Sequence, residues 1–85
     1  MTELDQHISV FALKAILRAG QAVTESFLKS SIRTGFAHLA FTEADLGHRI
    51  SSLETGGLIS GTTDSILGII WDLTPTGKIR AQQLS

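Results

Sequence analysis

The 85-residue chain has no cysteine, a single proline and no long apolar run. The lack of cysteine excludes disulfide bonds and thiolate metal sites. Lys14 and Arg18 interrupt the most apolar region, so no stretch approaches the ~18 apolar residues of a transmembrane helix. The first residues, MTELDQH, are acidic and lack the basic start of a signal peptide. We therefore expect a cytoplasmic protein that does not contact membranes.

The chain also lacks an excess of either charge, because seven Lys and Arg face eight Asp and Glu, for a net charge of −1. Phosphate neutralisation supplies much of the affinity of proteins for nucleic acid, so this balance argues against a tight nucleic-acid complex. The distribution is nevertheless uneven. Lys14, Arg18, Lys29 and Arg33 fall in the first 33 residues, whereas five acidic residues lie between positions 43 and 72.

Length and hydrophobic content predict one small globular domain over residues 1–85. A hydrophobic fraction of 42 % with eight glycines is typical of a folded chain and not of a disordered one. A chain of this length has room for a single domain, and it folds alone only with an efficient core.

The first predicted helix covers residues 5–19, with Asp5 as its N-cap and Gly20 as its C-terminal stop. Apolar side chains surround this segment except for a narrow polar stripe. A helix that is apolar around so much of its circumference is normally the central helix of a small bundle.

The second predicted helix covers residues 24–33, with Thr24 as its N-cap and Gly35 after its end. At about 100° per residue, the side chains expected to face the core are Phe27, Leu28 and Ile32. Residues 35–41 are consistent with either a buried loop or a short strand. Three apolar side chains of this segment are expected to fill the core: Phe36, Leu39 and Phe41.

The third predicted helix starts at Thr42, where Asp45 completes a capping box, and it ends at Gly56-Gly57. Its inward face is expected to hold Leu46, Ile50 and Leu53. Its outward face is expected to show Ala44, His48, Ser51, Ser52 and Thr55, with Arg49 on one flank. Exposed helix faces usually carry charged residues, so this small, polar and nearly uncharged face indicates a surface that another molecule covers.

The remaining residues predict a β-hairpin followed by a short helix. An extended segment begins at Leu58, a polar turn occupies residues 61–65, and residues 66–74 are rich in β-branched side chains. Alternation places Leu67, Ile69, Trp71 and Leu73 toward the core and Ile66, Ile70 and Asp72 on the opposite face. Thr74 caps the final helix, which has Pro75 at its first position and runs to about Leu84.

Two segments, LGHRISSLETGGLI at 46–59 and WDLTPTGKIRA at 71–81, resemble the signature of winged helix-turn-helix domains. In that superfamily, Leu-Glu-x-x-Gly-Leu-Ile ends the recognition helix and Leu-Thr-x-x-Gly opens the helix after the wing. The resemblance implies an α+β, mainly α fold with three helices, a two-stranded β-hairpin wing and a short C-terminal helix. The chain is more loosely similar to small winged-helix proteins of Mu-like phages and prophages. It departs from the usual pattern between Arg33 and Thr42, where about 8 residues replace the 3–4-residue turn of a compact helix-turn-helix.

The resemblance implies a small transcriptional regulator that places the helix at 42–55 in the major groove of double-stranded DNA. Ser, Thr, His and Arg side chains can donate or accept hydrogen bonds at base edges. Two cations one helical turn apart on the second helix would contact phosphates. The predicted DNA-binding residues are Lys29, Arg33, Ala44, His48, Arg49, Ser51, Ser52 and Thr55.

The hairpin favours a second interpretation, a protein-interaction module without DNA binding. Wings that enter a minor groove normally carry Arg or Lys at the tip, and residues 61–65 contain neither. Ile66 and Ile70 form a candidate interaction surface for a second copy or another protein. Such a module would be a subunit of a larger assembly or a phage-type inhibitor of a host factor. A homodimer would also suit a regulator of palindromic sites.

No combination of residues supports catalysis, a cofactor or a metal ion. The three histidines, His7, His38 and His48, fall on different predicted elements and no cysteine accompanies them. The chain has neither a Gly-x-Ser-x-Gly nucleophile elbow nor a phosphate-binding loop. We therefore expect a protein that is not an enzyme and that holds no metal or cofactor.

Overall fold

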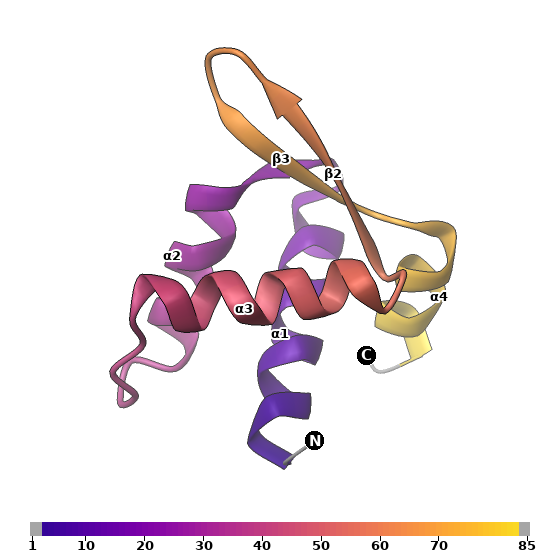
Figure 1. Ribbon diagram of the computed structural model, residues 1–85. Coiled ribbons are helices and arrows are strands. Elements are labelled where there is room, and N and C mark those ends of the chain that lie inside the picture. The colour runs from indigo at the N-terminus through magenta and orange to yellow at the C-terminus, as the bar shows by residue number, and fades with distance from the viewer. Residues whose placement is uncertain (1–2, 84–85) are drawn as a thin grey trace.

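The computed structural model describes residues 3–83, and over this range the fold is α+β and mainly helical (Figure 1). The elements follow one another as α1 (Glu3–Ala19), β1 (Val23–Thr24), α2 (Glu25–Gly35), α3 (Glu43–Thr55), β2 (Ile59–Asp64), β3 (Gly68–Leu73) and α4 (Pro75–Gln83). No helix in the described range is long and apolar enough to cross a membrane.

Helix α1 is the centre of the core, as its nearly continuous apolar surface predicts. It buries Ile8, Ala12, Leu13 and Ile16 against side chains of the other elements. Figure 1 shows α3 passing across it, with α2 and α4 on either side. The predicted end is confirmed, because Gly20 has a φ of +70° and its N–H donates to the Leu17 carbonyl at 3.1 Å.

The predicted start of α1 was wrong, since Asp5 lies inside the helix instead of capping it. The helix already includes Glu3 and Leu4, both of which have good helix propensity, so nothing in the local sequence stops it at Asp5.

Helix α2 begins where predicted, because the Thr24 hydroxyl accepts a hydrogen bond from the Phe27 N–H at 3.1 Å. Leu28 and Ile32 are fully buried. Phe27, in contrast, is 48 % exposed, so its predicted place in the core was wrong. The side chain of Phe27 lies about 100° around the helix from that of Leu28, which puts it at the edge of the buried stripe.

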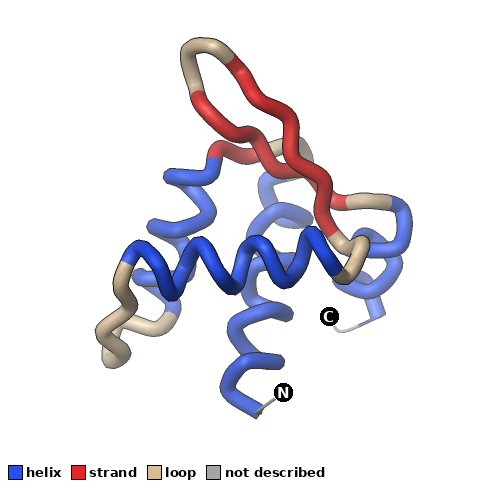
Figure 2. The backbone as a smooth tube through the Cα atoms, in the orientation of Figure 1, coloured by secondary structure: helices blue, strands red, loops and turns tan. Residues whose placement is uncertain are grey.

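The segment between α2 and α3 is a loop without a strand (Figure 2). Phe36 and Phe41 pack against the core as expected, and the Phe36 ring meets Phe11 edge to face at 5.4 Å between centroids. Leu39 is only half-buried and does not join the core cluster. Two aromatic residues therefore fix the path of this loop.

Helix α3 has the predicted capping box. The Thr42 hydroxyl accepts from the Asp45 N–H, and the Asp45 carboxylate accepts from the Thr42 N–H, both at 3.1 Å. At the other end, Gly57 has a φ of +75° and the Leu58 N–H donates to the Leu53 carbonyl at 3.1 Å. Both ends of α3 are thus fixed by residues that the sequence identifies.

The sheet has three antiparallel strands in the order β1-β3-β2, one more than the predicted hairpin. The additional strand, β1, contains only Val23 and Thr24, which pair with Trp71 and Ile70. A two-residue strand has no periodicity of its own, so only the position of β3 beside it reveals the pairing.

The predicted hairpin turn was wrong, since Gly61–Asp64 belongs to β2 and residues 65–67 form the turn. The Asp64 carboxylate accepts from the N–H groups of Ile66 and Leu67, each at 2.8 Å, which closes the turn. Gly61 instead lies opposite Trp71, and a Cβ at this position would lie 2.8 Å from the indole ring. The glycine therefore serves ring packing and not a turn.

The alternation predicted for β3 is confirmed at Trp71 and Leu73, which pack on the core. It fails at Leu67 and Ile69, which are 59 % and 38 % exposed, and at Ile70, which is half-buried instead of exposed. Figure 1 shows why: the distal half of the hairpin projects beyond the helices, where no core covers either face.

Helix α4 begins at Pro75 as predicted, while Leu84 lies outside the described residues. The Thr74 hydroxyl accepts from the Gly77 N–H at 3.0 Å and donates to the Gly57 carbonyl at 2.6 Å. A Cβ on Gly77 would overlap the carbonyl group of Leu58. These contacts join the end of α3, the base of the hairpin and the start of α4.

Gly77→Ala is expected to lower the free energy of unfolding by about 3 kcal/mol, the upper end of overpacking costs, because the new Cβ would strike backbone. Urea denaturation would measure this. The matched control is Gly47→Ala in α3, where a Cβ has nothing within 4 Å; it should raise stability by about 0.5–1 kcal/mol. Equal effects of the two substitutions would contradict the close approach at Gly77.

Candidate nucleic-acid interface

The outward face of α3 has the composition and exposure that the sequence predicts. Leu46, Ile50 and Leu53 are buried. The five predicted reading residues are all exposed: Ala44, His48, Ser51, Ser52 and Thr55. Spacings of four, three and four residues place four of them on one line along the helix, and the fifth lies beside that line. One helix therefore presents all five side chains together.

One of these residues is partly engaged within the helix. The Ser52 hydroxyl donates to the His48 carbonyl one turn earlier, at 3.0 Å. Its oxygen remains able to accept a hydrogen bond from an approaching group.

Arg49 lies on the flank of this face, as predicted, and is half-buried. Its guanidinium carbon lies 5.6 Å from the centroid of the Phe41 ring, in cation–π geometry. The loop that precedes α3 thus holds the Arg49 side chain beside the outward face of α3 and not on its central line.

The structure brings Lys29 and Arg33 together at one acidic side chain that sequence reasoning missed. The two carboxylate oxygens of Glu43 lie 2.9 Å from Lys29 Nζ and 2.9 Å from Arg33 Nη2. Lys29 Nζ also lies 3.7 Å from the carboxylate of Glu25, one turn earlier on α2. Two carboxylates therefore face the two cations that were predicted to contact phosphates.

Glu43 escaped notice because its partners are remote in sequence. It follows the N-cap of α3 directly, and 13 residues separate it from Lys29. Only the folded loop at 36–42 returns the chain to α2, as Figure 2 shows. The sequence signal was an acidic residue in the first turn of a helix, which is equally explained by the helix dipole.

The ion pair between Glu43 and Lys29 shifts the pKa of both side chains. The hydrogen bond from Lys29, with its positive charge, holds the pKa of Glu43 below its usual range. The same hydrogen bond raises the pKa of Lys29. The pKa of Asp45 is lowered as well, because the Thr42 N–H donates to its carboxylate. The first turn of α3 thus keeps two negative charges at neutral pH.

The tip of the hairpin is apolar. Ile66, in the turn, is 89 % exposed, and Leu67 in the same turn and Ile69 just after it are exposed as well. Figure 1 shows this end of the hairpin projecting from the body. Ile70, predicted to share a surface with Ile66, lies in the middle of the sheet between Thr24 and Thr62. The chain has no Lys or Arg between Arg49 and Lys78, so the hairpin carries no cation.

Among the side chains that the structure describes, those of residues 6–83, no group of three or more His, Cys, Asp or Glu is placed to hold a metal ion. Comparison with known proteins finds no matching family model, no matching curated protein and no matching solved structure.

Glu43→Gln is expected to lower the free energy of unfolding at neutral pH, where the carboxylate is charged and paired. Folding lowers the pKa of Glu43 below its ordinary 4.5. The stability from its ion pairs is therefore present above that value and is lost as the pH falls through the lower pKa of the folded state. Urea unfolding followed from neutral pH into the acid range should show the difference between wild type and variant shrinking as the pH falls below 4.5.

The matched control is Glu54→Gln, near the other end of the same helix, where the side chain is exposed. It should not lower stability at neutral pH, because a carboxylate near a helix C-terminus gains nothing from the dipole. A stability difference for Glu43→Gln that stays constant with pH would contradict the role of its charge.

Proposed function

We propose that the chain is a winged helix-turn-helix protein that binds double-stranded DNA through α3. The order of its elements and the hairpin beside the end of α3 support this assignment (Figure 1). The observation that carries the proposal is the outward face of α3, which is exposed along its length and has no long charged side chain on its central line.

The dimensions and chemistry of this face suit the major groove. A helix of 13 residues is about 20 Å long, and the groove is wide enough to admit it. His48, Ser51 and Thr55 can exchange hydrogen bonds with base edges, and Ala44 can contact a thymine methyl group. Arg49, on the flank, would lie near the phosphates of one strand.

The phosphate contacts of α2 would come from Lys29 and Arg33, which must leave Glu43 to make them. Exchanging one anion for another gains less affinity than pairing a free cation with a phosphate. The hairpin adds no cation. We therefore propose modest affinity for a single chain and a homodimer that reads two half-sites as a transcriptional regulator.

The test of DNA binding is a titration of a mixed-sequence duplex at several salt concentrations. Affinity should fall with salt, since binding releases counterions. At a selected binding site, Ser51→Ala should weaken binding about 5- to 100-fold, as expected for a lost base contact. Ser60→Ala, at an exposed serine on the hairpin, is the matched control and should have no effect.

Glu43→Gln should strengthen DNA binding, because it releases Lys29 and Arg33 to contact phosphates. The slope of log affinity against log salt concentration should become steeper by the equivalent of up to about two phosphate contacts. No binding to any duplex at low salt, or affinity that does not change with salt, would refute DNA binding. An unchanged salt slope for Glu43→Gln would refute only the part assigned to α2.

The apolar hairpin tip favours a second candidate function, a winged-helix module that binds another protein. Ile66, Leu67 and Ile69 are exposed apolar side chains in and just after the hairpin turn, and the hairpin carries no cation, unlike a wing that enters a groove. In this case the chain would be a subunit of an assembly or a phage-type inhibitor of a host factor.

The double substitution of Ile66 and Leu67 by Ser tests this candidate. A protein that co-purifies with the wild-type chain from the native host should no longer co-purify with the double variant, because the contact loses its apolar centre. Ile79→Ser is the matched control, since Ile79 is 56 % exposed on α4 and distant in sequence from the tip. Retention of the partner by the double variant would exclude the tip as the interface.

A further inference from the structure

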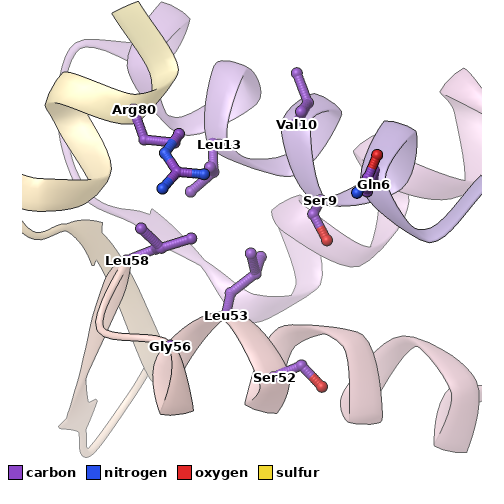
Figure 3. Close-up of a pocket in the computed structure, with 9 residues that line it drawn as sticks. All are labelled: Gln6, Ser9, Val10, Leu13, Ser52, Leu53, Gly56, Leu58 and Arg80. Carbon is purple, nitrogen blue, oxygen red and sulfur yellow. The ribbon is translucent and has the colours of Figure 1, made fainter. Parts of the chain in front are cut away.

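A cavity of about 410 Å³ lies between α1, α3 and α4, beside the base of the hairpin (Figure 3). Its apolar wall consists of Val10, Leu13, Leu53 and Leu58, which come from three separate segments of the chain. The volume falls within the roughly 300–1,000 Å³ of pockets that hold small molecules. It lies away from the apolar hairpin tip and from the ion pairs of Glu43.

Arg80 is the one charged side chain among the described residues that line this cavity. Figure 3 shows its guanidinium extending from α4 toward Leu13, above Leu58. Among residues 6–83, no acidic side chain lines the cavity, so no carboxylate of this range lies in its wall beside the cation. A guanidinium offers a planar pair of donors that matches a carboxylate.

The far end of the cavity is polar without charge. Gln6 and Ser9 of α1 lie there, separated from Arg80 by the leucine side chains (Figure 3). The cavity thus has a cationic end, an apolar middle and a neutral polar end. This gradient selects for a molecule with one anionic group and an apolar body, and it disfavours a compact dianion that would need more than one cation.

We propose that the cavity binds a small amphipathic monocarboxylate. The carboxylate pairs with the exposed Arg80 guanidinium, and the apolar body packs on the half-buried side chains of Val10 and Leu58. Ser52 lines the same cavity and also belongs to the outward face of α3, so the bound molecule lies against the helix proposed to read DNA. The site itself does not depend on DNA binding.

The experiment is a calorimetric titration of the full chain with octanoate, kept below its micelle concentration, and with octanol as the uncharged counterpart. Octanoate should bind saturably at one site and octanol at least about tenfold more weakly, since a charge-assisted hydrogen bond is lost. Arg80→Gln should weaken octanoate binding about 10- to 100-fold. Arg18→Gln, which removes an exposed cation from α1, should leave octanoate binding unchanged.

A second variant, Ser9→Phe, tests the cavity by filling it, and circular dichroism would verify that the variant folds. It should abolish octanoate binding while Arg80 remains in place. Equal affinity for octanoate and octanol, or binding that survives Arg80→Gln, would overturn the proposal. A third result would also overturn it: the chain does not bind octanoate but forms a dimer, and both Ile66→Ser and Arg80→Gln dissociate that dimer. The occupant of the cavity would then be the hairpin tip of a second copy. None of these outcomes involves DNA, so DNA binding is tested separately.

Discussion

The burial of one stripe of α3 is the constraint on which the rest of the molecule depends. Leu46, Ile50 and Leu53 are almost completely excluded from solvent, against the core that α1 organises. Burial of three large aliphatic side chains contributes several kcal/mol, on the order of 1.5–3 kcal/mol each, and it fixes the rotation of the helix. The opposite face has to point outward, which is how a line of small polar residues becomes a continuous surface.

Two different devices hold the ends of this helix. At its start, the capping box orients the first turn, and Glu43 there binds Lys29 and Arg33 of α2. At its end, Thr74 bonds to the Gly57 carbonyl and Gly77 packs on the backbone of Leu58. The first device is electrostatic and exposed, and therefore sensitive to salt and to competing anions. The second is a close backbone contact that neither salt nor pH relaxes.

This asymmetry links the fold to the proposed function. The cations that would contact phosphates also stabilise the orientation of α3 through Glu43, so binding DNA would exchange one role for the other. The hairpin contributes differently, since its base belongs to the core at Trp71 while its tip is apolar and uncharged. The surfaces of the molecule are thus divided between a polar helix face, an ion-pair cluster and an apolar tip.

The sequence alone determined the helices, the capping residues at Thr24, Thr42 and Thr74, and the two faces of α3, because these depend on local spacing and hydrogen bonding. Tertiary structure decided the rest. Strand β1 exists only because β3 lies beside it, and Gly61 is in a strand because the Trp71 ring covers it. Leu67 and Ile69 are exposed because the end of the hairpin extends beyond the helices that form the core. The ion pairs of Glu43 with Lys29 and Arg33 join two helices that are separated by a loop, and the path of this loop is set by packing. The periodicity of the sequence describes single elements, so it cannot predict a contact between two of them.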